Sequence, residues 1–189
     1  MPWNFSDAPA PSVFGALPTV TTGCRLPPSS DFVVYHITSF NPNVMNSSVV
    51  GPGSQSHTAF RIITDPLQPQ RTIWRDSHRR TVAIVDWSAR SVVEMPGLIP
   101  RQSVRSWLRL SSDRTSRHME VRGVHYVWAP VDHFICLYDM HGGASRIIAR
   151  VSSLSSSVGV ELTQRALQYG LLDVCILCAS IFLSGQNID

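Results

Sequence analysis

The pattern of hydrophobic and polar positions changes sharply near the end of the chain. Between residues 31 and 162, short runs of β-branched and aromatic residues alternate with turn residues, at intervals of about ten residues, which is typical of an antiparallel sandwich or barrel. Beyond Asp173 the chain loses its polar stripe. A helix that is apolar on all sides is buried in a core or in a membrane. The pattern therefore predicts a mainly β fold, an antiparallel barrel or curled sheet enclosing a hydrophobic C-terminal helix.

Individual strands are predicted wherever a β-branched or aromatic run is bounded by turn residues. Hairpins are expected at 76–78, at Arg122-Gly123 and at 141–143. The last two are predicted as tight turns, because glycine relieves the strain of positive φ there. The predicted strands cover residues 32–37, 57–64, 71–74, 81–87, 91–95, 118–121, 124–128, 134–139, 145–151 and 158–162.

The apolar C-terminal stretch has two interpretations, a core helix or a membrane anchor. A spanning helix needs about 20 mostly apolar residues, whereas the clean run here extends only from Val174 to Leu183. Asp173 would enter the membrane if the run were extended backwards, at a cost of about 2.5–3.5 kcal/mol. We therefore predict a helix over about residues 163–184, buried inside the β-structure rather than in a membrane, with these residues in the core: Ile176, Leu177, Ile181 and Phe182.

The segment from 101 to 110 fits two kinds of structure. Val104, Trp107 and Leu108 are spaced for one face of a short helix, which Pro100 would start well. An edge strand with Arg105, Trp107 and Arg109 on one side is the alternative. We favour the short helix.

Composition supports one domain preceded by a tail. The chain of 189 residues is the size of a single domain. Residues 1–30 are rich in proline and small residues and predict a flexible tail, and residues 31–185 form the predicted domain.

Only 15% of residues are charged, and the net charge of +3 is too small to indicate a nucleic-acid partner. Every basic residue is arginine, for which a bias of codon usage or lineage is the simplest explanation. The N-terminus has no secretory pattern and the cysteines form no regular framework, which indicates a cytoplasmic protein.

The sequence contains no recognisable catalytic constellation. Cys175 and Cys178 form a C-x-x-C, but they lie within the apolar run, so we interpret them as two small buried hydrophobic residues. The seven histidines are scattered without metal-ligand spacing. Residues 122–128 faintly resemble the core of an RNA-recognition sheet, but the helices of that module are missing. The sequence thus predicts neither an enzyme, nor a metal or cofactor, nor a nucleic-acid partner.

One basic stretch is the candidate binding site. Six arginines lie within 22 positions (101–122), opposed only by Asp113 and Glu120. Guanidinium groups hold phosphates through paired hydrogen bonds, so a face of this kind fits a phosphate headgroup, while a solvated surface is the alternative interpretation. The candidate residues for binding a lipid or another anion are Arg101, Arg105, Arg109, Arg114, Arg117 and Arg122.

The order of several short motifs resembles an uncharacterised domain family of mushroom-forming basidiomycete fungi, a family that is similar to the tubby-like superfamily. The likeness covers roughly residues 31–183. The resemblance implies a β-barrel threaded by a hydrophobic C-terminal helix, the shape shared by tubby proteins, phospholipid scramblases and LURP-one-related proteins. The lipid site of tubby proteins relies on Lys and Arg, and this chain lacks Lys, so no site residue is transferred. The motifs are 46–48, 60–64, 71–75, 82–87, 123–128, 148–151 and 171–173.

These observations give two leading hypotheses for function. The first is a non-enzymatic tubby-like module that binds anionic phospholipid headgroups. Such a module would be a peripheral protein at membranes. The second is a protein-interaction or regulatory domain without a lipid partner. An enzyme ranks last, although catalytic groups sometimes assemble from distant strands.

Overall fold

The computed structural model describes residues 28–40, 43–53, 57–88, 90–140, 145–153 and 157–189. Its helices are the 3₁₀ helix η1 (Ser29–Asp31) and the α-helices α1 (Val104–Trp107), α2 (Gln164–Gln168) and α3 (Leu172–Leu183). Its strands are β1 (Phe32–Thr38), β2 (Ser47–Val50), β3 (Thr58–Thr64), β4 (Arg71–Asp76), β5 (Thr81–Asp86), β6 (Val92–Met95), β7 (Ile99–Ser103), β8 (Arg109–Leu110), β9 (Arg117–Val121), β10 (Val124–Val131), β11 (Phe134–Asp139), β12 (Arg146–Ser153) and β13 (Val158–Thr163).

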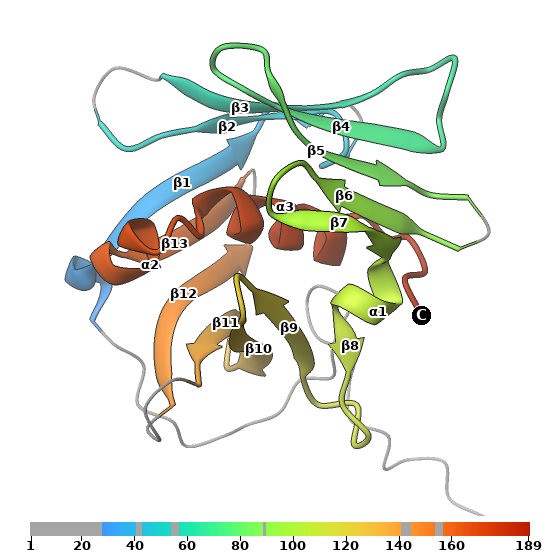
Figure 1. Cartoon of the computed structure of the whole chain (residues 1–189). Coiled ribbons are helices and arrows are strands. Elements are labelled where there is room, and N and C mark those ends of the chain that lie inside the picture. The colour runs from blue at the N-terminus through green and yellow to red at the C-terminus, as the bar shows by residue number, and fades with distance from the viewer. Residues whose placement is uncertain (1–27, 41–42, 54–56, 89, 141–144, 154–156) are drawn as a thin grey trace, which may run out of the picture.

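The described strands form one antiparallel sheet of thirteen members, in the order β7-β6-β5-β4-β3-β2-β1-β13-β12-β11-β10-β9-β8. Strands that follow one another in the chain are therefore neighbours, and the β1–β13 ladder joins the first half of the sheet to the second. The two edges, β7 and β8, are consecutive in the chain and are connected by α1 (Figure 1). The predicted antiparallel β fold is confirmed. The sheet curls but does not close, because no ladder joins β7 to β8 among the residues that the structure describes.

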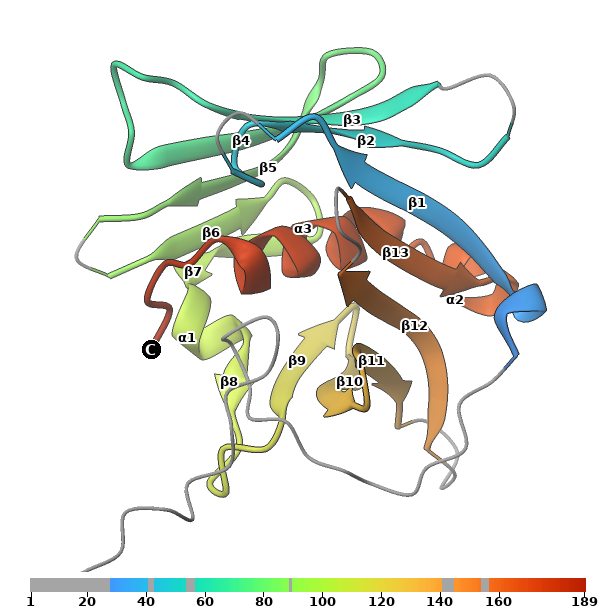
Figure 2. The same cartoon turned by 180° about the vertical axis from the view of Figure 1, so that it is seen from behind.

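The helix α3 lies in the hollow of the curled sheet. Both views place it between the half that contains β2–β7 and the half that contains β9–β12 (Figures 1 and 2). Trp74 on β4 donates from Nε1 to the Oγ of Ser180 at 3.2 Å, and Trp128 on β10 packs edge-on against Phe182, with ring centroids 5.5 Å apart. Each half of the sheet thus contacts the helix directly. The prediction of a buried C-terminal helix is confirmed, and the four predicted core residues are at most 3% exposed.

The predicted helix over residues 163–184 is interrupted. Thr163 caps α2, accepting a hydrogen bond from the amide of Ala166 at 3.3 Å, but α2 ends after one turn. Gly170 adopts φ +68°, and its amide donates to the carbonyl of Leu167, while the next amide, of Leu171, donates back to the carbonyl of Ala166. This is the Schellman arrangement that ends helices at glycine, so α3 begins only at Leu172. Of the helices described, none has the length and apolarity needed to cross a membrane.

The hairpin predictions have different outcomes. Arg122 and Gly123 connect β9 to β10 with φ values of 53° and 75°, as a two-residue turn of type I′ requires, so this turn is confirmed. The hairpin at 76–78 is also confirmed, since it connects the paired strands β4 and β5. The predicted turn at 141–143 lies outside the described residues, and so does most of the predicted tail.

The segment from 101 to 110 contains both of the structures that its pattern allows. Residues 101–103 end the edge strand β7, α1 follows as a single turn, and β8 takes up Arg109 and Leu110. Ser103 starts α1 because its Oγ accepts a hydrogen bond from the amide of Ser106 at 3.1 Å. The predicted short helix is confirmed, but it covers only four residues. The arginines of this segment therefore do not share one helical face.

Candidate functional site

Three of the six predicted arginines converge on a groove at the gap between the two sheet edges. Arg105 comes from α1, Arg109 from β8 and Arg114 from the turn between β8 and β9, and all three are exposed. The groove has a volume of about 790 Å³, and its lining is Arg105, Ser106, Arg109, Leu110, Ser111, Ser112, Arg114 and Asp189. We call this the arginine groove. Among the lining residues, three guanidinium groups and several hydroxyls face a single carboxylate.

Local backbone bonds hold the turn that carries Arg114. The amide of Ser111 donates to the carbonyl of Ser116 at 2.9 Å, and the amide of Arg114 donates to the carbonyl of Ser111 at 3.0 Å. Arg114 itself is left-handed, with φ 59°. Asp113 accepts hydrogen bonds from the Oγ of Ser111 and from the amide of Thr115. Its carboxylate therefore stabilises the turn and is not part of the groove lining.

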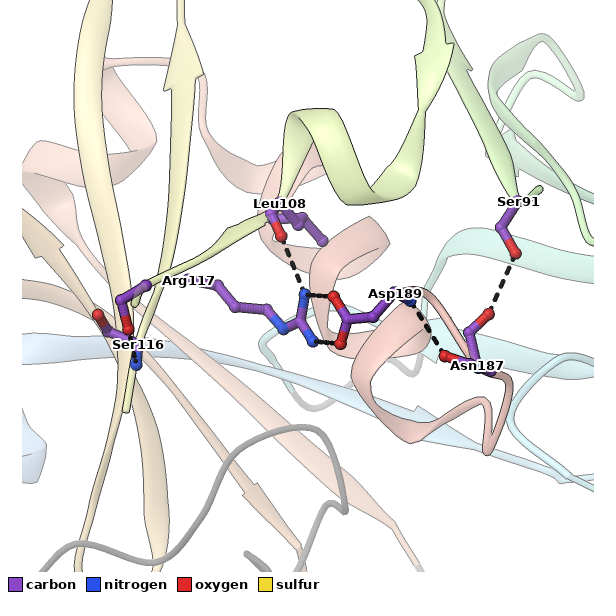
Figure 3. Close-up of polar contacts among 7 residues, drawn as sticks. Ser91, Leu108, Ser116, Arg117, Asn187 and Asp189 are labelled. Carbon is purple, nitrogen blue, oxygen red and sulfur yellow. Dashed lines mark hydrogen bonds and ion pairs between the residues drawn. The ribbon is translucent and has the colours of Figure 1, made fainter. Parts of the chain in front are cut away.

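Arg117 lies beneath the groove and is not on its surface. The side chain points inward from β9 and is only 2% exposed. Its Nη1 donates to the carbonyl of Leu108 at 3.0 Å, and its two terminal nitrogens bind both carboxylate oxygens of Asp189, at 3.0 and 2.6 Å (Figure 3). Burying a charge is costly unless the charge is paired, and the carboxylate of Asp189 supplies the pair for the Arg117 guanidinium.

The C-terminal residues 185–189 cross the gap between the sheet edges; we call them the tail strap. The Oγ of Ser91, just before β6, donates to the carbonyl of Asn187 at 3.3 Å (Figure 3), and Ile188 is buried. At its end, Asp189 binds β9 through Arg117. The strap thus connects the first half of the sheet to the second.

A second groove adjoins the first and is lined in part by residues 186–189 of the strap. Its volume is about 600 Å³, and it shares Arg105 and Asp189 with the arginine groove. Arg90 adds a further exposed guanidinium to its lining. Sequence reasoning missed Arg90 and Asp189, because both lie outside the predicted basic stretch.

The two remaining predicted arginines lie away from the groove. Arg101 is exposed on β7, with ion-pair distances of 3.9 Å to Asp86 and 3.8 Å to Glu94. Arg122 lies at the β9–β10 turn and donates to the carbonyl of Tyr169 at 3.2 Å. Of the six predicted arginines, the structure therefore brings three together on one exposed surface, with Arg117 buried beneath them.

The other candidate groups give no second site of this kind. Cys175 and Cys178 are fully buried on α3, and burial raises the pKa of both thiols, in keeping with their interpretation as small hydrophobic residues. In the part of the chain that the structure describes, no three His, Cys, Asp or Glu side chains are grouped so that they could hold a metal ion.

Two histidines lie beside the groove on the outer face of β9 and β10. The Nδ1 of His118 lies 3.1 Å from the Nε2 of His125, and the register places Arg109 opposite His118. The pKa of His118 is lowered from its usual value of 6.5, first by partial burial, then by the charges of His125 and Arg109; Asp113 acts in the opposite direction. The folded protein therefore takes up this proton at a lower pH than the unfolded chain.

This shift predicts a pH dependence of stability. A lowered pKa for a base means that the contribution of His118 is fully present above pH 6.5 and is lost as the pH falls through the folded-state pKa. We expect His118→Gln to flatten the decline in the free energy of unfolding between about pH 7 and pH 5, measured by urea unfolding at a series of pH values. An unchanged pH slope in the variant would contradict this assignment.

Comparisons of the chain with protein-family models, with curated proteins and with solved structures find no match.

Proposed function

We propose that this chain is a non-enzymatic, tubby-like module that binds anionic phospholipid headgroups at a membrane surface through the arginine groove. The observation that carries the proposal is the convergence of Arg105, Arg109 and Arg114 on one groove beside serine hydroxyls. Guanidinium groups bind phosphate oxygens in pairs and keep their charge at any physiological pH. A cytoplasmic protein with such a groove would bind peripherally to the anionic inner leaflet.

The fold supports this proposal at a coarser level. A sheet curled around a hydrophobic C-terminal helix is similar to the helix-threaded β-barrel that the resemblance to tubby-like proteins implies, but this sheet is not closed. The shape alone does not fix a function, so the proposed lipid binding depends on the arginine groove. The position of the groove also fits a surface role, because its three arginines are exposed and lie at the sheet edges, on α1, on β8 and on the turn after β8.

The proposal predicts that vesicle binding depends on two of these arginines. A basic side chain near an anionic bilayer contributes about 1 kcal/mol, so Arg105→Gln with Arg109→Gln should weaken binding by about 2 kcal/mol, roughly 30-fold. The measurement is co-sedimentation with phosphatidylcholine vesicles with and without phosphatidylserine. Binding should also weaken as salt rises, since the Debye length is only about 8 Å at physiological ionic strength.

A charge-matched variant controls for net charge. Arg71 and Arg75 are exposed on β4 and line neither groove, so changing both to Gln removes the same charge elsewhere. We expect this control to bind nearly as well as the wild type. Equal binding by the wild type and the groove variant, with circular dichroism showing both folded, would contradict the proposed site.

A further inference from the structure

We propose that Arg117 is a second anion-binding position of this site, occupied in the free protein by the Asp189 carboxylate and open to a phosphate group when the tail strap is displaced. The proposal rests on the proposed function, because the anion would reach Arg117 through the arginine groove. It adds a deeper position and an internal competitor for the ligand.

The two partners of this ion pair are held very differently. Arg117 belongs to a strand paired on both sides, and its side chain is 2% exposed. Asp189 lies on the irregular strap beyond α3, and its side chain is 40% exposed. The Arg117 guanidinium is therefore held by the sheet, whereas the Asp189 carboxylate lies on a segment with few contacts. Segments of that kind open at low cost compared with the core.

The strap has few polar contacts. Besides the bonds from Arg117, the described ones are the Ser91–Asn187 hydrogen bond and two short-range bonds of 3.1 Å, from the amide of Gln186 to the Oγ of Ser184 and from the amide of Asp189 to the Oδ1 of Asn187. Ile188 is buried. The strap begins at Gly185, which has φ +70°. Displacing the strap would thus disturb none of the sheet ladders.

The guanidinium of Arg117 also has unused binding capacity. Its two terminal nitrogens are engaged by Asp189 and by the Leu108 carbonyl, but its Nε is buried without a hydrogen-bond acceptor among the described residues. A carboxylate supplies two oxygens, whereas a phosphate group has more acceptor oxygens and, as a monoester, more charge. A phosphate group is therefore the class of ligand best able to replace Asp189.

The position of Asp189 makes such an exchange direct. Its carboxylate lines the arginine groove together with Arg105, Arg109 and Arg114. An anion held by these three side chains is next to Asp189 and repels it. Removal of that carboxylate places the Arg117 guanidinium at the floor of the groove, and we infer that anion binding and release of the strap are coupled.

The test compares Asp189→Asn with the wild type. We expect the variant to unfold at a lower temperature in chloride buffer, and inorganic phosphate at matched ionic strength to restore much of the loss. Its affinity for phosphate, from calorimetry, should exceed that of the wild type at least tenfold. Glu120→Gln, which removes one exposed carboxylate from the outer face of β9, controls for the change in net charge.

A second substitution identifies Arg117 as the cause. Asp189→Asn combined with Arg117→Gln should lose the gain in phosphate affinity. A gain that survives Arg117→Gln, or one no larger than that of Glu120→Gln, would overturn the proposal. If Asp189→Asn does not fold, the amide spectrum of the wild type decides. Phosphate should shift the signals of residues 187–189 towards those of an unstructured chain, and unmoved signals at saturating phosphate would overturn the proposal.

These outcomes separate the two proposals. Vesicle binding that depends on Arg105 and Arg109, without a gain in Asp189→Asn, would leave the groove standing and overturn the exchange at Arg117. A gain that requires Arg117, without an effect of the groove variant, would support the exchange and contradict the groove. Vesicles with phosphatidic acid, compared with phosphate alone, show whether a lipid headgroup or free phosphate is the ligand.

Discussion

A chain that ends at Leu172 is expected to collapse without forming a fixed core. The truncation removes α3, in which all residues from Val174 to Phe182 are buried. The inner face of the curled sheet would then have no helix to pack against. Loss of packing with retained collapse gives a molten state that binds hydrophobic dyes. Near-ultraviolet circular dichroism and dye binding measure this result directly.

A chain that ends at Gly185 is the matched control for this truncation. It keeps α3 but lacks the partner of Arg117, so we expect it to be less stable and still to unfold cooperatively. A Leu172 truncation that is soluble and unfolds cooperatively would contradict the core role of α3, and would instead fit a helix that serves as a membrane anchor.

Trp74→Ala is expected to lower the free energy of unfolding by about 3–5 kcal/mol. Trp74 is fully buried on β4 and contacts α3 through its hydrogen bond to Ser180, so the substitution leaves a cavity between sheet and helix and removes a buried partner. Chemical denaturation of the wild type and the variant gives the difference.

Ser180→Ala separates the hydrogen bond from the packing. The Ser180 hydroxyl donates to the carbonyl of Ile176 at 2.7 Å and accepts from Trp74. Its loss should cost only about 1–3 kcal/mol, for one buried donor left unsatisfied. Equal losses in the two variants would mean that the hydrogen bond, and not the packing of the indole, joins this half of the sheet to the helix.

The strand pattern and the apolar helix could be predicted from the sequence because both are local signals. Alternation marks strands such as β4, where Thr72 and Trp74 point inward, and a run that is apolar all round marks α3. The strand β2 was missed because its two serines weaken the hydrophobic signal. The break before α3 did have a signal, Gly170 in the run Gln-Tyr-Gly-Leu, which fits a helix C-terminus.

The site was predictable only in part, because counting charges ignores the side of the strand. In β9, Arg117 shares its face with Met119 and Val121, and this face points to the core. Alternation alone could therefore have indicated a buried arginine in need of an anion. Its partner, Asp189, lies 72 positions away, and no local pattern connects the two. Convergence of α1, β8 and the following turn on one groove likewise depends on the curl of the sheet.

Amide chemical shifts can show directly whether the arginine groove contacts an anionic membrane surface. The ¹⁵N-labelled protein would be titrated with lipid nanodiscs that contain phosphatidylserine, and separately with neutral nanodiscs. If the arginine groove binds anionic lipid, only the anionic nanodiscs should perturb the spectrum, and high salt should reverse the changes. The largest changes should occur at Arg105, Ser106, residues 109–112 and Arg114. Changes centred on another surface, or equal changes with neutral nanodiscs, would contradict binding of anionic lipid through the arginine groove.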